Sequence, residues 1–295
     1  MTLNDDQRGA LLMNVAMLVF PLSDAFTKAA LQTLPLFQTI ALRGALAVAG
    51  LLLVARLSGA VRLWPAAPRD RGILAVRTLA EVAGALLFLA ALRHMALGNI
   101  AAILQALPLA VTLAAALVFG ERIGWRRLSA IGIGFAGVLL ILRPGGEGFD
   151  RWSALAVASV CAIVVRDLAS RRLGPSVPSI AVGIWAAGAV MLSGFIGSAL
   201  GGWQPVGAME LAYLAGSAAN LVVGYVAVVS ALRVGDIGFV APFRYMSLVW
   251  AIVLGWAVFG TWPDAPTFAG AGIVVATGLF TLWREHRMSQ ARNRG

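Results

Sequence analysis

The chain has 295 residues, of which 60% are hydrophobic and 12% charged, and its mean hydropathy is +0.87. Soluble domains are about 45–50% apolar and about 25% charged, so the composition excludes an ordinary soluble enzyme, a disordered chain and a coiled coil, and it indicates a polytopic membrane protein. The formal charge is +10, but the bases lie in short breaks between apolar runs, which argues against nucleic acid as a partner.

The apolar runs are each long enough to cross a bilayer, which takes about 20 residues of helix. Alternating segments of about ten residues, which would indicate a β-barrel, are not visible. We therefore expect an all-α integral membrane protein with ten spans. In chain order these are 9–31, 36–57, 72–92, 97–119, 127–143, 152–170, 178–200, 209–232, 237–260 and 266–284.

The positions of the bases predict the orientation. Lys and Arg accumulate on the cytoplasmic side of membrane proteins, and here they concentrate after spans 2, 4 and 6 and in the C-terminal tail. Both termini are therefore expected in the cytoplasm, with the chain in the inner membrane. The first run contains Asp24 and Lys28 and is expected to be a retained span rather than a signal peptide.

An internal repeat is visible at a shift of 140 residues, which aligns spans 4–5 with spans 9–10 without a gap. Ala91-Leu92-Arg93 falls on Ala231-Leu232-Arg233, and Val118-Phe119-Gly120 falls on Val258-Phe259-Gly260. These tripeptide matches favour a duplication over chance similarity between Ala- and Leu-rich helices.

The repeat predicts two five-helix halves, residues 1–146 and 147–295. Because five is odd, the second half enters the membrane from the opposite side, and such inverted repeats are a transporter architecture with a substrate site near the bilayer midplane. Spans 5 and 10 are expected to brace the halves. Their small-residue pairs, Gly132/Ala136 and Gly272/Ala276, are expected to serve helix packing.

Residues 108–142 read PLAVTLAAALVFGERIGWRRLSAIGIGFAGVLLIL. This stretch resembles the EamA-type exporters of the drug/metabolite transporter superfamily, through Pro108, the Phe119-Gly120-Glu121 end and the glycine-rich helix that follows. The resemblance implies ten helices in two inverted repeats and export of small metabolites. It is strongest toward the aromatic amino-acid exporters. The second copy departs from the pattern, because Thr261 stands where the first copy has Glu121.

Two arginines lie deep inside predicted spans, where charged groups are costly and often functional. Arg43 is in span 2, and Arg244 is in span 9 between Phe243 and Tyr245. A guanidinium matches a carboxylate in shape, so either arginine could bind the carboxylate of an amino acid or metabolite. The alternative is a structural pair with a buried acid, Asp24 or Glu81, and the residues alone leave both open.

Acidic side chains inside the spans are candidates for proton coupling. Glu81 lies four residues after Arg77 on one helix face, which also fits a self-neutralising structural pair. Asp24 is the second coupling candidate, and Lys28 shares its face.

Further polar and proline residues mark the middle of the spans. Gln105 falls on Tyr245 at the 140-residue shift, which fits either a shared cavity lining or a helix–helix hydrogen bond. Asn220, in span 8, has the same two interpretations. Pro108 and Pro242 remove backbone donors inside spans and are candidates for hinges or simple kinks.

Two further expectations concern side chains near span ends and aromatic rings. Arg166 and Asp167 lie toward the end of span 6 and are expected to extend to the membrane surface. Trp185, inside span 7, would suit stacking with an aromatic substrate, whereas packing or lipid contact is the alternative.

Other function classes find little support. One cysteine, Cys161, and two separated histidines, His94 and His286, make a metal site or a catalytic cluster improbable, and no phosphate-binding loop for ATP is present. We expect no cofactor and no enzyme activity. The predicted function is alternating-access export of small metabolites, most consistent with aromatic or apolar amino acids. The alternatives are a nucleotide-sugar or sugar-phosphate antiporter, a channel or scramblase, and a membrane enzyme. The partners expected are a small-molecule substrate and the lipid bilayer, and a monomer is plausible.

Overall fold

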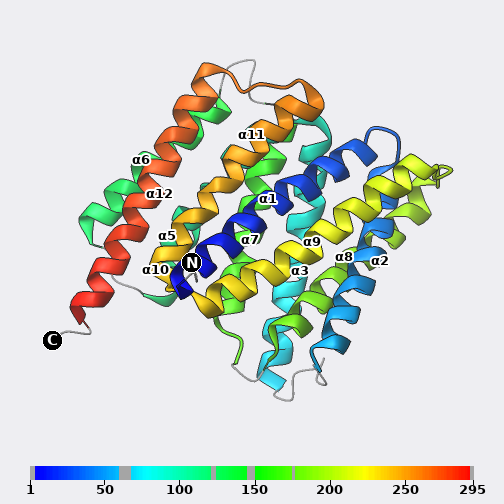
Figure 1. Ribbon diagram of the computed structural model, residues 1–295. Coiled ribbons are helices and arrows are strands. Elements are labelled where there is room, and N and C mark those ends of the chain that lie inside the picture. Colours follow the sequence, from blue (N-terminus) through cyan, green and yellow to red (C-terminus); the bar gives the residue numbers. More distant parts are fainter. Residues whose placement is uncertain (1–3, 60–67, 121–123, 145–149, 175–176, 293–295) are drawn as a thin grey trace. The chain divides into compact units, whose positions relative to one another are not determined.

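The computed structural model describes residues 4–59, 68–120, 124–144, 150–174 and 177–292, and each regular element in these ranges is a helix (Figure 1). The helices are α1 (Asp5–Ala30), α2 (Leu36–Leu57), α3 (Pro68–His94), α4 (Leu97–Leu104), α5 (Leu107–Phe119), α6 (Trp125–Leu142), α7 (Arg151–Arg171), α8 (Ser179–Gly201), α9 (Ala208–Val234), α10 (Ile237–Val240), the 3-10 helix η1 (Ala241–Tyr245), α11 (Met246–Phe259) and α12 (Ala265–Arg292).

Ten helical segments in these ranges are long and apolar enough to cross a membrane, and they coincide with the ten predicted spans to within a few residues. Spans 4 and 9 are each built from more than one helix. Large apolar side chains such as Leu53 and Leu117 are exposed, which is costly in water but favourable against acyl chains. The prediction of an all-α, ten-span membrane protein is confirmed.

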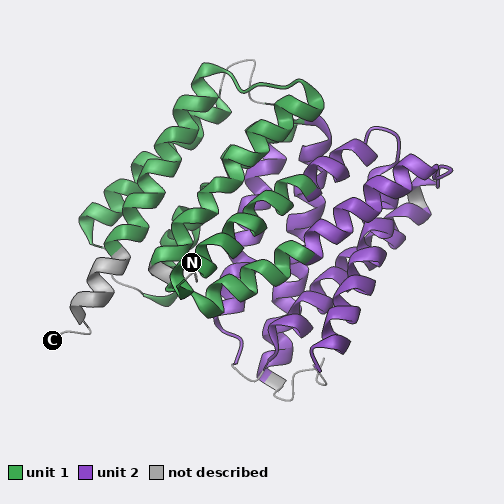
Figure 2. Cartoon of the chain, viewed as in Figure 1, with its two compact units in different colours: residues 1–22, 95–153, 223–295 green, residues 23–94, 154–222 purple. Residues whose placement is uncertain are grey.

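The chain folds into two compact units (Figure 2). Unit 1 comprises residues 1–22, 95–153 and 223–295, and unit 2 comprises residues 23–94 and 154–222. Neither unit is one half of the sequence. Each collects spans from both halves: spans 4, 5, 9 and 10 lie in unit 1, and spans 2, 3, 7 and most of span 6 lie in unit 2, while spans 1 and 8 are divided between the units. The predicted division into residues 1–146 and 147–295 rests on the sequence repeat, not on these compact units, and stays a prediction.

Glycines let helices approach their counterparts in the other half of the sequence. In unit 2, a Cβ atom on Gly44 of α2 would lie 2.8 Å from the Cα of Met191 on α8. A Cβ atom on Gly194 of α8 would in turn collide with the backbone of Ala41 on α2. Spans 2 and 7 therefore pack backbone to backbone, as small residues allow in membrane helices.

Spans 5 and 10 pack in the same way in unit 1, but through other residues than expected. A Cβ atom on Gly270 of α12 would lie 2.5 Å from the carbonyl oxygen of Gly137 on α6. Gly132 and Gly272 have open space beside them, and both are exposed. The prediction that the pairs containing Gly132 and Gly272 mediate packing is wrong, because these pairs lie on the opposite face of each helix from the contact.

The ends of repeat-related helices are also alike. α5 stops at Gly120 with φ of 69°, and α11 stops at Gly260 with φ of 64°. Glycine adopts this left-handed conformation at little cost and is favoured just after a helix. The sequence match at Phe119-Gly120 and Phe259-Gly260 thus corresponds to the same local geometry.

Asp264 begins α12 and joins it to the end of α6. Its Oδ1 accepts a hydrogen bond from the backbone N–H of Thr267 at 3.2 Å, and its other oxygen pairs with Arg143. Hydrogen bonding by Thr267, followed by that of Arg143, lowers the pKa of Asp264 to about 2. The negative charge also faces the positive end of the helix dipole.

We expect Gly270→Ala to lower the stability of the protein, because the added methyl group would overlap the Gly137 carbonyl. Overpacking of this kind costs about 1–3 kcal/mol. The measurement is the thermal unfolding midpoint in detergent micelles. Gly272→Ala, on the same helix but beside open space, is the matched control and should leave the midpoint unchanged. Equal midpoints for the two variants would contradict the packing described.

We expect Asp264→Asn to destabilise the protein at neutral pH and to do so less as the pH falls. A carboxylate whose pKa is lower in the folded state contributes its full stabilisation above the unfolded pKa of about 4. That stabilisation is lost as the pH falls through the folded value of about 2. Thermal midpoints of both proteins measured between neutral and acidic pH should converge at the acidic end. A constant difference at every pH would contradict this origin.

Candidate functional site

Two repeat-related spans of unit 1 are interrupted in the middle. Span 4 breaks at Gln105 and Ala106, between α4 and α5, and Pro108 follows in the first turn of α5. Span 9 breaks into α10, η1 and α11, and Pro242 lies in η1. Proline has no N–H to continue a helix. The backbone stays in the right-handed helical region at Gln105, Ala106 and Tyr245. The prolines therefore lie at local changes of helix geometry, and whether these act as hinges or are simple kinks stays a prediction.

Gln105 connects the two breaks. Its side-chain amide is buried and donates hydrogen bonds to the carbonyl oxygen of Tyr245 and to Oγ of Ser247, both at 3.2 Å. Ser247 in turn donates to the carbonyl of Arg244 at 3.0 Å. Of the two interpretations of Gln105, the helix–helix hydrogen bond is the one found. Ser247 was not singled out in the sequence, where a lone serine in an apolar helix gives no signal.

The rings beside Arg244 differ in exposure. Tyr245 is buried, and its hydroxyl packs against Gly278 on α12, where any side chain would collide with it. That hydroxyl has no hydrogen-bond partner among the described residues. Phe243 is half-buried, and its ring centroid lies 5.9 Å from that of Phe239. Tyr245 is thus part of the core of unit 1, while Phe243 retains an accessible edge.

Arg244 lies in η1, at the break itself, and is exposed. Within the described ranges its guanidinium makes no hydrogen bond or ion pair. The structural alternative, a pair with Glu81, is not formed, since Glu81 binds Arg77 and Arg166. Arg244 is therefore a cationic group in a 3-10 turn in the middle of a span, and the described residues supply no hydrogen bond or ion pair for it.

Arg43 belongs to a different group of polar side chains, in unit 2. It donates from Nε to Oγ of Ser217 at 2.8 Å and from Nη2 to Oγ of Ser23 at 3.3 Å. Ser217 also contacts Oγ of Ser23 at 3.0 Å and Oγ1 of Thr27 at 2.7 Å. We call Ser23, Thr27, Arg43 and Ser217 the hydroxyl cluster. Asp24 interacts with Arg43 through charge.

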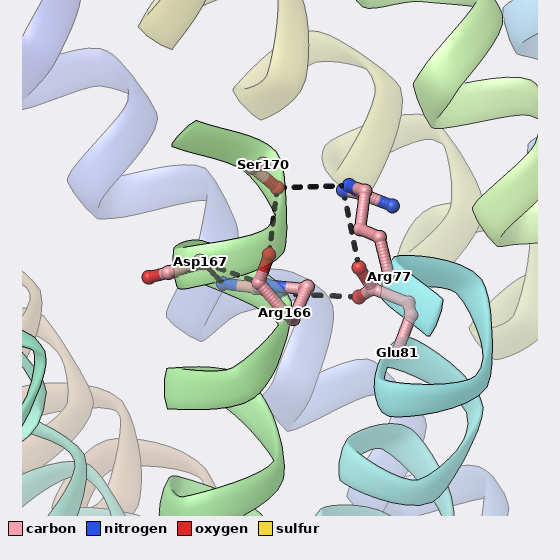
Figure 3. A network of polar contacts seen from close by, with 5 residues as sticks. All are labelled: Arg77, Glu81, Arg166, Asp167 and Ser170. Carbon is pink, nitrogen blue, oxygen red and sulfur yellow. Dashed lines mark hydrogen bonds and ion pairs between the residues drawn. The ribbon is translucent and has the colours of Figure 1, made fainter. Parts of the chain in front are cut away.

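Arg77, Glu81, Arg166, Asp167 and Ser170 form the ionic cluster of unit 2 (Figure 3). Glu81 on α3 pairs with Arg77 at 3.3 Å and with Arg166 of α7 at 3.3 Å. Arg166 also pairs with Asp167 at 2.9 Å, and Arg77 donates from Nε to Ser170 at 3.1 Å. The expectation that Arg166 extends to the membrane surface is wrong, because α3 offers it a carboxylate.

The remaining predicted residues lie apart from these groups. Asn220 donates to the carbonyl of Gly216 one turn earlier at 2.8 Å, within α9. Trp185 is exposed on α8. Lys28 donates to the carbonyl of Leu92 near the end of α3 at 2.8 Å, where a positive charge is favourable. Glu121, part of the motif that carried the family resemblance, lies outside the described residues.

We expect Gln105→Leu to destabilise the protein, because it removes the two hydrogen bonds that the buried amide donates to the Tyr245 carbonyl and the Ser247 hydroxyl. Burying an unsatisfied polar group costs about 1–3 kcal/mol, and the cost appears as a lower thermal midpoint. Gln32→Leu is the control, since Gln32 is exposed just after α1. If both variants unfold at the same temperature, the hydrogen bonds of Gln105 do not support the breaks.

Comparison with known proteins identifies relatives of the chain. Residues 7–143 match the model of the EamA-like transporter family. A riboflavin transporter of Vibrio cholerae is 29% identical over 200 residues, 65% of this chain and 65% of that protein. An S-adenosylmethionine uptake transporter of Rickettsia conorii is 24% identical over 185 residues, 61% of each chain. These matches span less than two thirds of the relatives' lengths.

One solved crystal structure covers 96% of this chain and 99% of its own, with a TM-score of 0.66 and 19% identity. At that identity the likeness concerns the fold alone. The narrower resemblance to aromatic amino-acid exporters is not confirmed by these relatives. The broader resemblance, to EamA-type transporters of the drug/metabolite transporter superfamily, is confirmed for residues 7–143, which match the EamA-like transporter family.

Proposed function

We propose that the protein is a secondary transporter that moves a small organic molecule across a bacterial inner membrane by alternating access. The proposal is supported by the EamA-family domain, by ten candidate spans and by bacterial relatives named as transporters. The cytoplasmic location of both termini, predicted from the bases, is part of the same proposal.

The observation that carries the proposal is Arg244 at the break in span 9. Interrupted helices at corresponding positions of two repeats are the best sequence indicator of a transporter's binding site. A charged group inside a span that has no partner of its own is a functional candidate. Arg244 would bind an anionic group of the substrate, for which its planar guanidinium is suited. Phe243, beside it, would contact an apolar or aromatic part.

The compounds for which the relatives are named suggest a chemical class for the substrate. Riboflavin and S-adenosylmethionine both carry a flat nitrogen heterocycle, and the second also carries an amino-acid carboxylate. We propose a substrate that joins a carboxylate or similar anionic group to a ring or apolar group, a class that includes the aromatic amino acids expected from the sequence. Because the Rickettsia conorii relative is an uptake transporter, import is favoured over the export that the resemblance implied.

A phosphate-rich substrate fits less well. A nucleotide-sugar or sugar-phosphate site needs several bases, whereas Arg43, Arg77 and Lys28 already bind groups of the protein itself. A carrier would show saturable counterflow, which a channel or a scramblase would not. Counterflow measured in proteoliposomes, with a sugar phosphate among the substrates, therefore tests the phosphate-rich substrate and the channel or scramblase in one experiment.

We expect Arg244→Ala to reduce counterflow about ten- to hundredfold, since a hydrogen bond to a charged group contributes about 1.5–3 kcal/mol. The substrates to test are riboflavin, S-adenosylmethionine, aromatic and apolar amino acids, and a sugar phosphate. Arg244→Lys should recover part of the activity because the charge remains.

Arg233→Ala is the matched control, because Arg233 is also an exposed arginine of unit 1 but lies at the end of α9. Its counterflow should equal that of the unaltered protein. Unchanged transport by Arg244→Ala would show that Arg244 does not bind the substrate. No saturable flux of any compound would contradict the transport proposal itself.

A further inference from the structure

The ionic cluster and the hydroxyl cluster occupy corresponding places in the two halves of the sequence. Arg77 of α3 and Ser217 of α9 are 140 residues apart, the same shift that relates spans 4–5 to spans 9–10. Each is the ninth residue after the start of its helix. Their partners correspond as well, since Thr27 of α1 and Ser170 of α7 contact them in the same way.

Glycines beside the clusters repeat this correspondence. A Cβ atom on Gly84 of α3 would lie 3.2 Å from Ile163 of α7, and one on Gly224 of α9 would lie 2.7 Å from Phe20 of α1. Gly84 and Gly224 are again 140 residues apart. The contact of α3 with α7 and the contact of α1 with α9 are therefore two copies of one arrangement.

The two contacts lie on opposite sides of the membrane. Successive spans run in alternating directions, so α3, the third span, begins on the side of the N-terminus, and α7, the sixth, ends there. α1 ends on the other side, where α9, the eighth span, begins. In the ionic cluster, Arg166 and Ser170 lie in the last two turns of α7 and contact Glu81, at the middle of α3, and Arg77, in its first half. In the hydroxyl cluster, Ser23 and Thr27 lie in the last two turns of α1 and contact Ser217, in the first half of α9.

Each contact also joins the two halves of the sequence. α1, α2 and α3 belong to the first half, and α7 and α9 belong to the second. The bonds that cross between halves are Glu81 to Arg166 and Arg77 to Ser170 in one cluster. In the other, every cross-half bond involves Ser217: its hydroxyl accepts from Arg43 and is hydrogen-bonded to the hydroxyls of Ser23 and Thr27.

The charged side chains keep partners when these cross-half bonds break. Arg77 and Glu81 pair within α3, and Arg166 and Asp167 pair within α7. Arg43 retains Ser23 and the charge of Asp24, both of the first half. An unpaired charge inside the membrane would be costly, and this arrangement avoids one. Contacts built this way can open and close repeatedly.

We propose that the ionic cluster and the hydroxyl cluster are the two gates of the transporter, one on each side of the membrane, and that weakening either one biases the protein toward opening on that side. This inference rests on the proposed alternating-access function. It goes beyond it by assigning the contacts that must break in each state, with Glu81 and Ser217 as the side chains on which the gates depend.

The test measures distances across both gates by electron spin resonance between pairs of spin labels, in liposomes and without substrate. Labels replace exposed residues at the helix ends: Arg69 and Arg172 on the N-terminal side, and Gln32 and Met209 on the other side. The background is Cys161→Ala, because Cys161 is exposed and would also be labelled.

We expect Glu81→Gln to lengthen the Arg69–Arg172 label distance and Ser217→Ala to lengthen the Gln32–Met209 distance. Each should change the ratio of open to closed populations on its own side about tenfold, which corresponds to about 1.4 kcal/mol. If Glu81→Gln does not fold, Ser170→Ala removes the other cross-half bond of the ionic cluster and should act in the same direction.

Two controls separate gating from simple support of the fold. Ser159→Ala alters a buried serine of α7 that donates to the carbonyl of Ala156, and Ser193→Ala alters a serine of α8 that donates to the carbonyl of Val190. Neither should move a distance distribution. The gate assignment would be overturned if both gate variants lengthened the distance on the same side of the membrane, or if neither variant changed a distance. Since no substrate is present, this result is independent of the counterflow experiment, whose failure would instead reject the transport function.

Discussion

A helix that is interrupted inside a bilayer leaves backbone groups that hydrocarbon cannot satisfy, and the candidate site of this protein depends on how that constraint is met. Pro108 and Pro242 lie at the two interruptions. The amide of Gln105 satisfies the Tyr245 carbonyl, and Ser247 satisfies the carbonyl of Arg244. Side chains thus take the place of water, and the two breaks stabilise each other.

The position of Arg244 follows from this arrangement. Arg244 lies in η1, a short 3-10 segment. The hydroxyl of Ser247 donates to the carbonyl oxygen of Arg244 and so holds this segment in place. The polar side chains around it are used up by the backbone, and Tyr245 is buried against α12. The guanidinium of Arg244 is left as the charge available to a ligand.

Most of the fold could be predicted, because span length and apolar content are properties of the sequence alone. The ten spans, and the similarity of spans 4 and 9 at the 140-residue shift, needed no tertiary information. Which face of a helix meets a neighbour did need it. Small residues recur on several faces of α6 and α12, so the pattern pointed to Gly132 and Gly272 although Gly137 and Gly270 form the contact.

The partners of the polar side chains also could not be predicted without the tertiary structure. Arg166 was expected to reach the membrane surface. Its partner Glu81 lies 85 residues away on another helix, so the sequence alone did not show that the two would meet. Ser217 was overlooked because a serine in an apolar span gives no signal until Ser23, Thr27 and Arg43 are seen around it. Gln105 and Tyr245 were paired by the repeat before their hydrogen bond was known.

The distribution of charge in unit 2 combines two opposing demands on a membrane transporter. An unpaired charge inside a bilayer is costly, yet a pair that holds two moving parts together opposes their motion. In the ionic cluster each acid has a base on its own half of the chain: Glu81 has Arg77, and Asp167 has Arg166. The bonds between halves are then additional ones, and losing them does not leave a bare charge in the membrane. A structure required only to be stable would gain nothing from this duplication, whereas one that must separate and rejoin at two sides of a membrane would.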